Sequence, residues 1–111
     1  MSVKEKFKYG NQELTMELGF RISRELTKFD IDILDIASDG ELLGNLLVND
    51  SLMLNIFMYY VKPQVQHSEE RILDVLDESP TGLEDFRNKF IDLIVAFSPP
   101  SARNVIREQI D

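Results

Sequence analysis

The segment from Thr81 to Phe97 constrains the fold most, because it predicts one long amphipathic helix with well-marked ends. Its apolar residues recur at intervals of three and four, which places them on one helix face; they are Leu83, Phe86, Phe90, Leu93, Ile94 and Phe97. Ser79-Pro80 precedes the segment and Ser98-Pro99-Pro100 ends it. We interpret Thr81 and Glu84 as a capping box at its start. So wide an apolar face must be covered by other elements, which implies a folded core.

The N-terminal segment predicts a β-hairpin over residues 5–18. Gly10-Asn11 is suited to a tight turn, because both residues tolerate positive φ. After the turn, Leu14, Met16 and Leu18 alternate with polar residues, the period of a half-buried strand. Two strands alone are marginal in water, so we expect their apolar face to lie on helices or on another subunit.

The helical body is predicted to span residues 20–97. A short amphipathic helix over 20–28 is followed by an extended link or single turn at 30–36. Ser38 or Asp39 is expected to cap a leucine-rich helix ending near Asn49. Asp50 is expected to cap the next helix, SLMLNIFMYYV, which Pro63 stops. Ser68 is expected to cap a fourth helix before the Thr81–Phe97 helix.

These elements predict a mainly α fold with a short N-terminal β-hairpin, a small single-domain bundle of about five helices over residues 1–111. Residues 101–111 form either a further short helix or a tail. The chain has no cysteine, so a disulfide framework is excluded. No apolar run approaches the ~20 residues of a membrane span, so we expect no membrane partner and a place in the cytoplasm.

Charge is divided unevenly along the chain. Residues 1–28 have six basic and four acidic side chains, a net of +2, and residues 30–111 have six basic and sixteen acidic ones, a net of −10. Between Asp30 and Val61 there are six acids and no base. An acidic surface repels phosphate backbones, so we expect no direct nucleic-acid binding.

The residues of catalytic and metal sites do not occur here in a recognisable pattern. His67 is the single histidine, and we interpret it as a surface loop residue before a helix rather than a general base. Asp30, Asp32 and Glu41 follow part of the spacing of a calcium loop, but Asp35 stands where its sharp turn needs glycine. We therefore expect a protein that is no enzyme and has no cofactor or metal, and whose function is to bind other proteins.

Two apolar strips are the candidate partner-binding residues. The first is the run Phe57, Met58, Tyr59 and Tyr60, of which one or two side chains should point away from the core. Tyr and Met are favoured at adaptable interfaces. The second is the C-terminal strip Val105, Ile106 and Ile110. Core packing is the commoner use of such residues, yet strips of this kind would also allow a homo-oligomer.

The opening segment FKYGNQELTMELGFRISRELTKFDIDIL resembles the tail assembly chaperones of long-tailed, siphovirus-type bacteriophages. In that family a strand, a Gly-Asn or similar turn and a second strand precede a helix with an L-x-K ending and a D-I-L stretch. Here these are Phe7–Tyr9, Gly10-Asn11, Leu14–Leu18, Leu26–Lys28 and Asp32–Leu34. The similarity continues in order to residue 97, through a leucine-rich helix, an aromatic helix and two acidic helices.

The resemblance implies a function and partners. Members of this family coat the long, aggregation-prone tape-measure protein and help recruit tail-tube subunits in the host cytoplasm. They often occur in a short and a longer, frameshifted form, and this chain would correspond to the short one. The alternative is an acidic inhibitor or regulator that blocks a host protein, for example by mimicking nucleic acid, which the net charge of residues 30–111 motivates.

Overall fold

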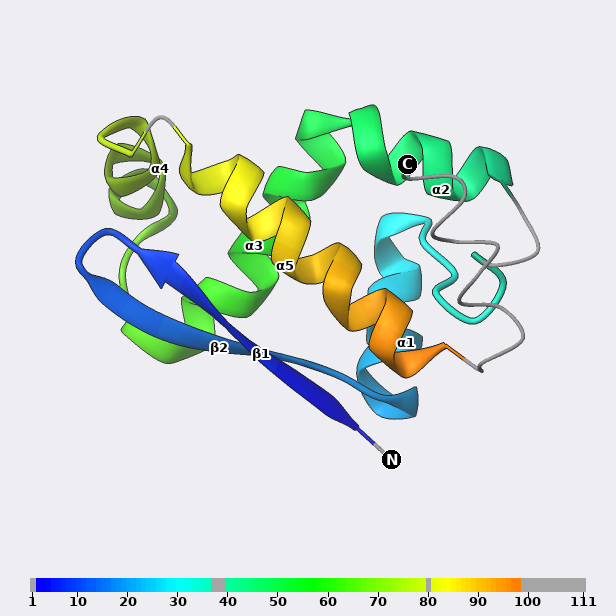
Figure 1. Cartoon of the computed structure of the whole chain (residues 1–111). Coiled ribbons are helices and arrows are strands. Elements are labelled where there is room, and N and C mark those ends of the chain that lie inside the picture. Colours follow the sequence, from blue (N-terminus) through cyan, green and yellow to red (C-terminus); the bar gives the residue numbers. More distant parts are fainter. Residues whose placement is uncertain (1, 37–39, 80, 99–111) are drawn as a thin grey trace.

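The computed structural model describes residues 2–36, 40–79 and 81–98. A two-stranded hairpin is followed by helices that run to Phe97 (Figure 1). The elements are β1 (Val3–Tyr9), β2 (Gln12–Leu18), α1 (Phe20–Leu26), the 3-10 turn η1 (Thr27–Phe29), α2 (Gly40–Val48), α3 (Asp50–Val65), α4 (Glu69–Asp77) and α5 (Gly82–Phe97). The predicted fold class, mainly α with a short N-terminal β-hairpin, is confirmed.

The hairpin is antiparallel and closes with a two-residue turn. Tyr9 pairs with Gln12 across Gly10-Asn11, and Val3 pairs with Leu18 at the open end, so the hairpin begins two residues before the predicted position. Of the two turn residues only Gly10 has a positive φ, +59°. A positive φ at the first central position alone is the pattern of a type II′ turn, which suits the twist of paired strands.

The two faces of the hairpin differ in chemistry. Phe7 and Tyr9 of β1 and the alternating apolar residues of β2 are buried, as the sequence period predicts. Lys4, Lys6 and Lys8 are exposed on the opposite face. Helices α3 and α5 cross each other over the apolar face, while α4 lies beside the turn and α1 at the open end of the hairpin (Figure 1). The marginal pair of strands is thereby stabilised by the helices.

Helix α3 differs from its prediction at both ends. Its N-cap is Asn49, whose Oδ1 accepts a hydrogen bond from the Leu52 amide at 3.0 Å, and not Asp50. Asp50 instead forms an ion pair with the buried Arg87 of α5. The helix also continues through Pro63 to Val65, so the prediction that Pro63 ends it was wrong. Its C-cap is Gln66, which has a left-handed conformation.

Of the predicted N-terminal caps of α4 and α5, the first is confirmed and the second is wrong. Ser68 caps α4 as predicted, and its hydroxyl accepts from the Arg71 amide at 3.1 Å. Thr81 occupies the N-cap position of α5 but makes no side-chain cap hydrogen bond. Glu84 lies 2.5 Å from a guanidinium nitrogen of Arg87 instead of reaching back, so the capping box was wrong. The competing ion pair explains the difference.

Residues 30–36 form an irregular link with a turn over residues 33–36, as expected. Ile31, Ile33 and Ile36 are buried in the core, whereas Leu34 is exposed. The expected caps Ser38 and Asp39 and the C-terminal residues 101–111 lie outside the described residues.

Replacing Gly10 with alanine should lower the free energy of unfolding by about 1–2 kcal/mol, the cost of a left-handed conformation for a residue with a Cβ. A Cβ at this position would also lie 3.2 Å from Cγ1 of Val75. Gly44→Ala in α2 is the matched control, because a Cβ there meets nothing within 4 Å. That change should raise stability by up to ~1 kcal/mol through helix propensity. Urea unfolding of both variants checks this, and equal effects would contradict the turn assignment.

Candidate functional site

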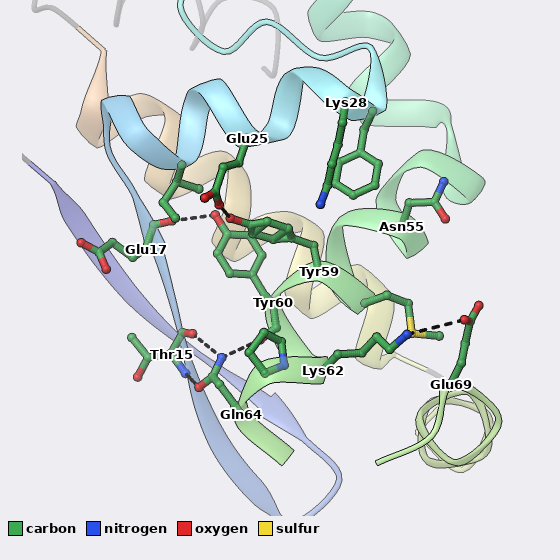
Figure 2. Close-up of a pocket in the computed structure, with 14 residues that line it drawn as sticks. Thr15, Glu17, Glu25, Lys28, Asn55, Tyr59, Tyr60, Lys62, Gln64 and Glu69 are labelled. Carbon is green, nitrogen blue, oxygen red and sulfur yellow. Dashed lines mark hydrogen bonds and ion pairs between the residues drawn. The ribbon is translucent and has the colours of Figure 1, made fainter. Parts of the chain in front are cut away.

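A groove of about 740 Å³ lies between β2, α1 with η1, α3 and the start of α4 (Figure 2). Its apolar lining comes from three elements; the residues are Ile22, Phe29, Met58, Tyr59 and Tyr60. Charged residues also line it; they are Glu17, Glu25, Lys28, Lys62 and Glu69. This volume is within the range of roughly 300–1,000 Å³ typical of ligand pockets.

The β2 wall of the groove is closed by side chains of α3 rather than by a third strand. The Gln64 amide donates to the Thr15 carbonyl at 2.7 Å and accepts from the Thr15 amide at 3.1 Å (Figure 2). The Tyr60 hydroxyl donates to the Glu17 carbonyl at 2.6 Å. These contacts satisfy edge groups of β2 that a neighbouring strand would otherwise bind.

The same amide also strengthens the last turn of α3, beyond Pro63. Proline has no N–H and so removes one bond of the helix ladder. One residue later, Gln64 Nε2 donates to the Tyr60 carbonyl at 2.8 Å in addition to its bond to Thr15. Gln64 therefore ties the last turn of the helix both to itself and to the hairpin. Ending the helix at Pro63 would remove this link.

The α1 wall of the groove carries a compact set of aromatic and charged groups. The Tyr59 hydroxyl donates to the Glu25 carboxylate. Lys28 Nζ lies 4.9 Å from the centroid of the Tyr59 ring and 5.1 Å from that of Phe29. Burial, and secondly the hydrogen bond to Glu25, raise the pKa of Tyr59 above its usual value. The phenol thus stays neutral and remains a donor.

A second hollow, of about 610 Å³, adjoins the groove along α1. The two share Glu17, Ile22 and Glu25 as lining residues. The second hollow is also lined by Phe20, which is 65% exposed and whose ring lies 5.3 Å from that of Phe97. The hollow therefore connects the groove, along α1, to an exposed aromatic ring.

The structure places the predicted partner-binding residues differently from one another. Phe57 is 1% exposed and belongs to the core, so its assignment to a binding surface is corrected. Met58 and Tyr60 are buried at 9% and 6% exposure but still line the groove, and Tyr59 is half-buried there. The reason is helical geometry, since successive residues point about 100° apart and four cannot share one face. Val105, Ile106 and Ile110 lie outside the described residues.

Several groove residues were missed in the sequence. Gln64 lies beyond Pro63, the predicted end of the helix, and Glu25 and Lys28 belong to the amphipathic helix predicted over residues 20–28, directly before Phe29. The pairing of Glu25 with Tyr59 joins residues 34 positions apart, and no local pattern carries it. In the sequence, Lys28 stands out only as the L-x-K ending of the family resemblance.

His67 is half-buried rather than fully exposed. Its Nδ1 lies 2.8 Å from the Tyr9 hydroxyl, across 58 residues of sequence. This contact joins the loop before α4 to β1 and gives the histidine a structural partner. Within residues 2–36, 40–79 and 81–98, no group of three or more His, Asp or Glu side chains is placed to hold a metal ion.

Comparisons with family models, with curated proteins and with solved structures found no match to this chain. None of the helices in the described part of the chain is both long and apolar enough to cross a membrane.

Gln64→Ala should lower the free energy of unfolding by about 1 kcal/mol, because three hydrogen bonds at an exposed position are lost to water. Gln12→Ala, an exposed glutamine at the start of β2, is the control and should change stability by less than about 0.5 kcal/mol. Hydrogen exchange of the Thr15 amide should quicken only in the Gln64 variant. Unchanged exchange there would refute the edge-closing role.

All three tyrosines have a raised pKa, chiefly because of burial. In the folded protein, tyrosinate absorbance should therefore develop only above the usual value of about 10, at which the urea-unfolded chain titrates. Because the pKa is higher in the folded state than in the unfolded state, the neutral tyrosines contribute to the free energy of unfolding. This contribution is complete below about pH 10 and is lost as the pH rises further. Ultraviolet titration of both states measures the shift, and coincident midpoints would disprove it.

Proposed function

We propose that this chain is a non-catalytic tail assembly chaperone of a long-tailed bacteriophage, which binds the tape-measure protein and helps recruit tail-tube subunits in the host cytoplasm. The resemblance of residues 7–34, continued in order to residue 97, supports this proposal. The hairpin, turn and following helix that the resemblance implies are elements of the described fold.

The observation that carries the proposal is the groove with its adjoining hollow. An amphipathic helix binds by laying its apolar face into such a groove, with anchors at spacings of three, four and seven residues. The apolar lining around Tyr59 and Ile22 would take the anchors, and the charged lining would meet the polar flanks of the helix. A long helical client suits this geometry because one segment after another can occupy the same groove.

A protein that coats such a client must present apolar surface without aggregating. The net charge of −8 opposes self-precipitation, while exposed apolar side chains such as Phe20 provide contact surface. Binding through several linked copies would raise the avidity for a long client, so we propose a homo-oligomer as the working form. Light scattering over a range of concentrations tests that part separately.

The groove and its adjoining hollow, which Phe20 lines, are tested by calorimetry with peptides that tile the tape-measure protein of the same phage. Phe20→Glu should weaken the best peptide about tenfold or more, since ~1.4 kcal/mol of lost contact corresponds to that factor. Val48→Glu is the matched control, because Val48 is 79% exposed, lies in another helix and gains the same charge. The affinity of the Val48→Glu variant for the same peptide should be unchanged.

Two results would count against the proposal. Failure of every peptide to bind would refute client recognition, and equal weakening by the two variants would remove the groove as its location. The acidic alternative predicts a different outcome, in which a basic host protein binds the chain and DNA competes for it.

A further inference from the structure

The groove contains a cation held between two aromatic rings. The Lys28 ammonium lies 4.9 Å from the Tyr59 centroid and 5.1 Å from the Phe29 centroid, within the range of a cation–π interaction. The two rings are 6.2 Å apart and nearly perpendicular, at 87°. Figure 2 shows Lys28 extending from η1 toward Tyr59. This position is therefore electrostatically suited to a positive charge.

A carboxylate reinforces that preference. Glu25 accepts the hydrogen bond of the Tyr59 hydroxyl and so places its carboxylate beside the ring pair. On the far side Lys62 is already paired, at 3.9 Å from Glu69. Arg21 also lies on α1, in the adjoining hollow. The ring pair and the Glu25 carboxylate thus favour a cation at this end of the groove, and Lys28 supplies it from within the chain.

The Lys28 side chain is only weakly held in this position. Its side chain is exposed and is carried by a single 3-10 turn at the edge of the groove. A long, flexible, solvated lysine can rotate away without disturbing the core. A second cation brought to the same rings would meet the charge of Lys28, so the two would exchange rather than bind together.

We infer that the Phe29–Tyr59 ring pair is the recognition site for a lysine or arginine of a helix docked in the groove, and that Lys28 is an internal stand-in which this side chain displaces. The inference rests on the proposed function insofar as an amphipathic helix occupies the groove. It adds the chemistry of the partner, which is a basic residue beside the apolar face. The net charge of −8 favours the approach of such a partner.

Two synthetic amphipathic helical peptides provide the probe, identical except for one lysine or norleucine beside a leucine face. Lys28→Ala should raise the affinity for the lysine peptide about three- to tenfold, because the ring site is then vacant. Lys62→Ala is the matched control, since it removes the same charge from another position on the same groove. It should raise the affinity less, and the norleucine peptide should respond equally and weakly to both variants.

A third variant, Tyr59→Leu, should abolish the preference for lysine over norleucine while keeping apolar binding. Its circular dichroism and thermal unfolding establish that it is folded, and NMR shifts of the Phe29 and Tyr59 ring protons locate the peptide in the wild type. Equal gains in Lys28→Ala and Lys62→Ala would overturn the ring site and leave only general charge. Preference surviving in Tyr59→Leu would overturn it as well.

The outcome in which neither peptide binds any form of the protein is distinct from these. It removes the groove as a helix site, and the inference and the groove part of the proposed function fall together. Binding of both peptides with no effect of Lys28→Ala overturns the inference alone.

Discussion

The packing of Phe86 against two rings from distant parts of the chain holds the fold together. Its ring meets Phe7 of β1 and Phe57 of α3 edge to face, each with centroids 5.1 Å apart. All three side chains are at most 1% exposed. Edge-to-face pairs add to the burial of apolar area, and here they join the hairpin, α3 and α5 at one point. Without this junction the two strands would have too little contact to persist.

The same junction sets the position of the groove. Because Phe57 faces Phe86, the following residues of α3 are turned toward the hairpin edge and α1. Tyr60 lies 6.1 Å from Phe86, and its hydroxyl reaches the Glu17 carbonyl, so it belongs to the core and to the groove wall at once. Tyr59 is turned further out, toward Glu25. The floor of the groove is therefore fixed by the core, while its charged residues are long and exposed.

The sequence predicted the elements whose signals are local. The alternation in β2, the turn at Gly10 and the three-four spacing in α5 are each contained within a few residues. The predictions that failed concern features that depend on competition between groups distant in the sequence. Asp50 and Glu84 both have the chemistry of caps, yet both pair with Arg87, whose guanidinium is buried between them. The proline rule failed in α3 because Gln64 finds partners on β2, 49 residues away, a gain that no local pattern records.

The groove itself could not have been predicted, since its lining comes from segments that meet only in the folded chain. The groove accounts for one feature of the charge distribution in the sequence. No base occurs between Lys28 and Lys62, and the two lysines that border this stretch both line the groove. Lys62 has a carboxylate partner in Glu69, whereas Lys28 lies over two rings. A cation that is held by aromatic faces can be replaced by another cation of similar reach, because the rings and the nearby Glu25 carboxylate select charge rather than a particular residue. The chemistry that positions Lys28 is thus the chemistry that would recognise a basic side chain of a partner.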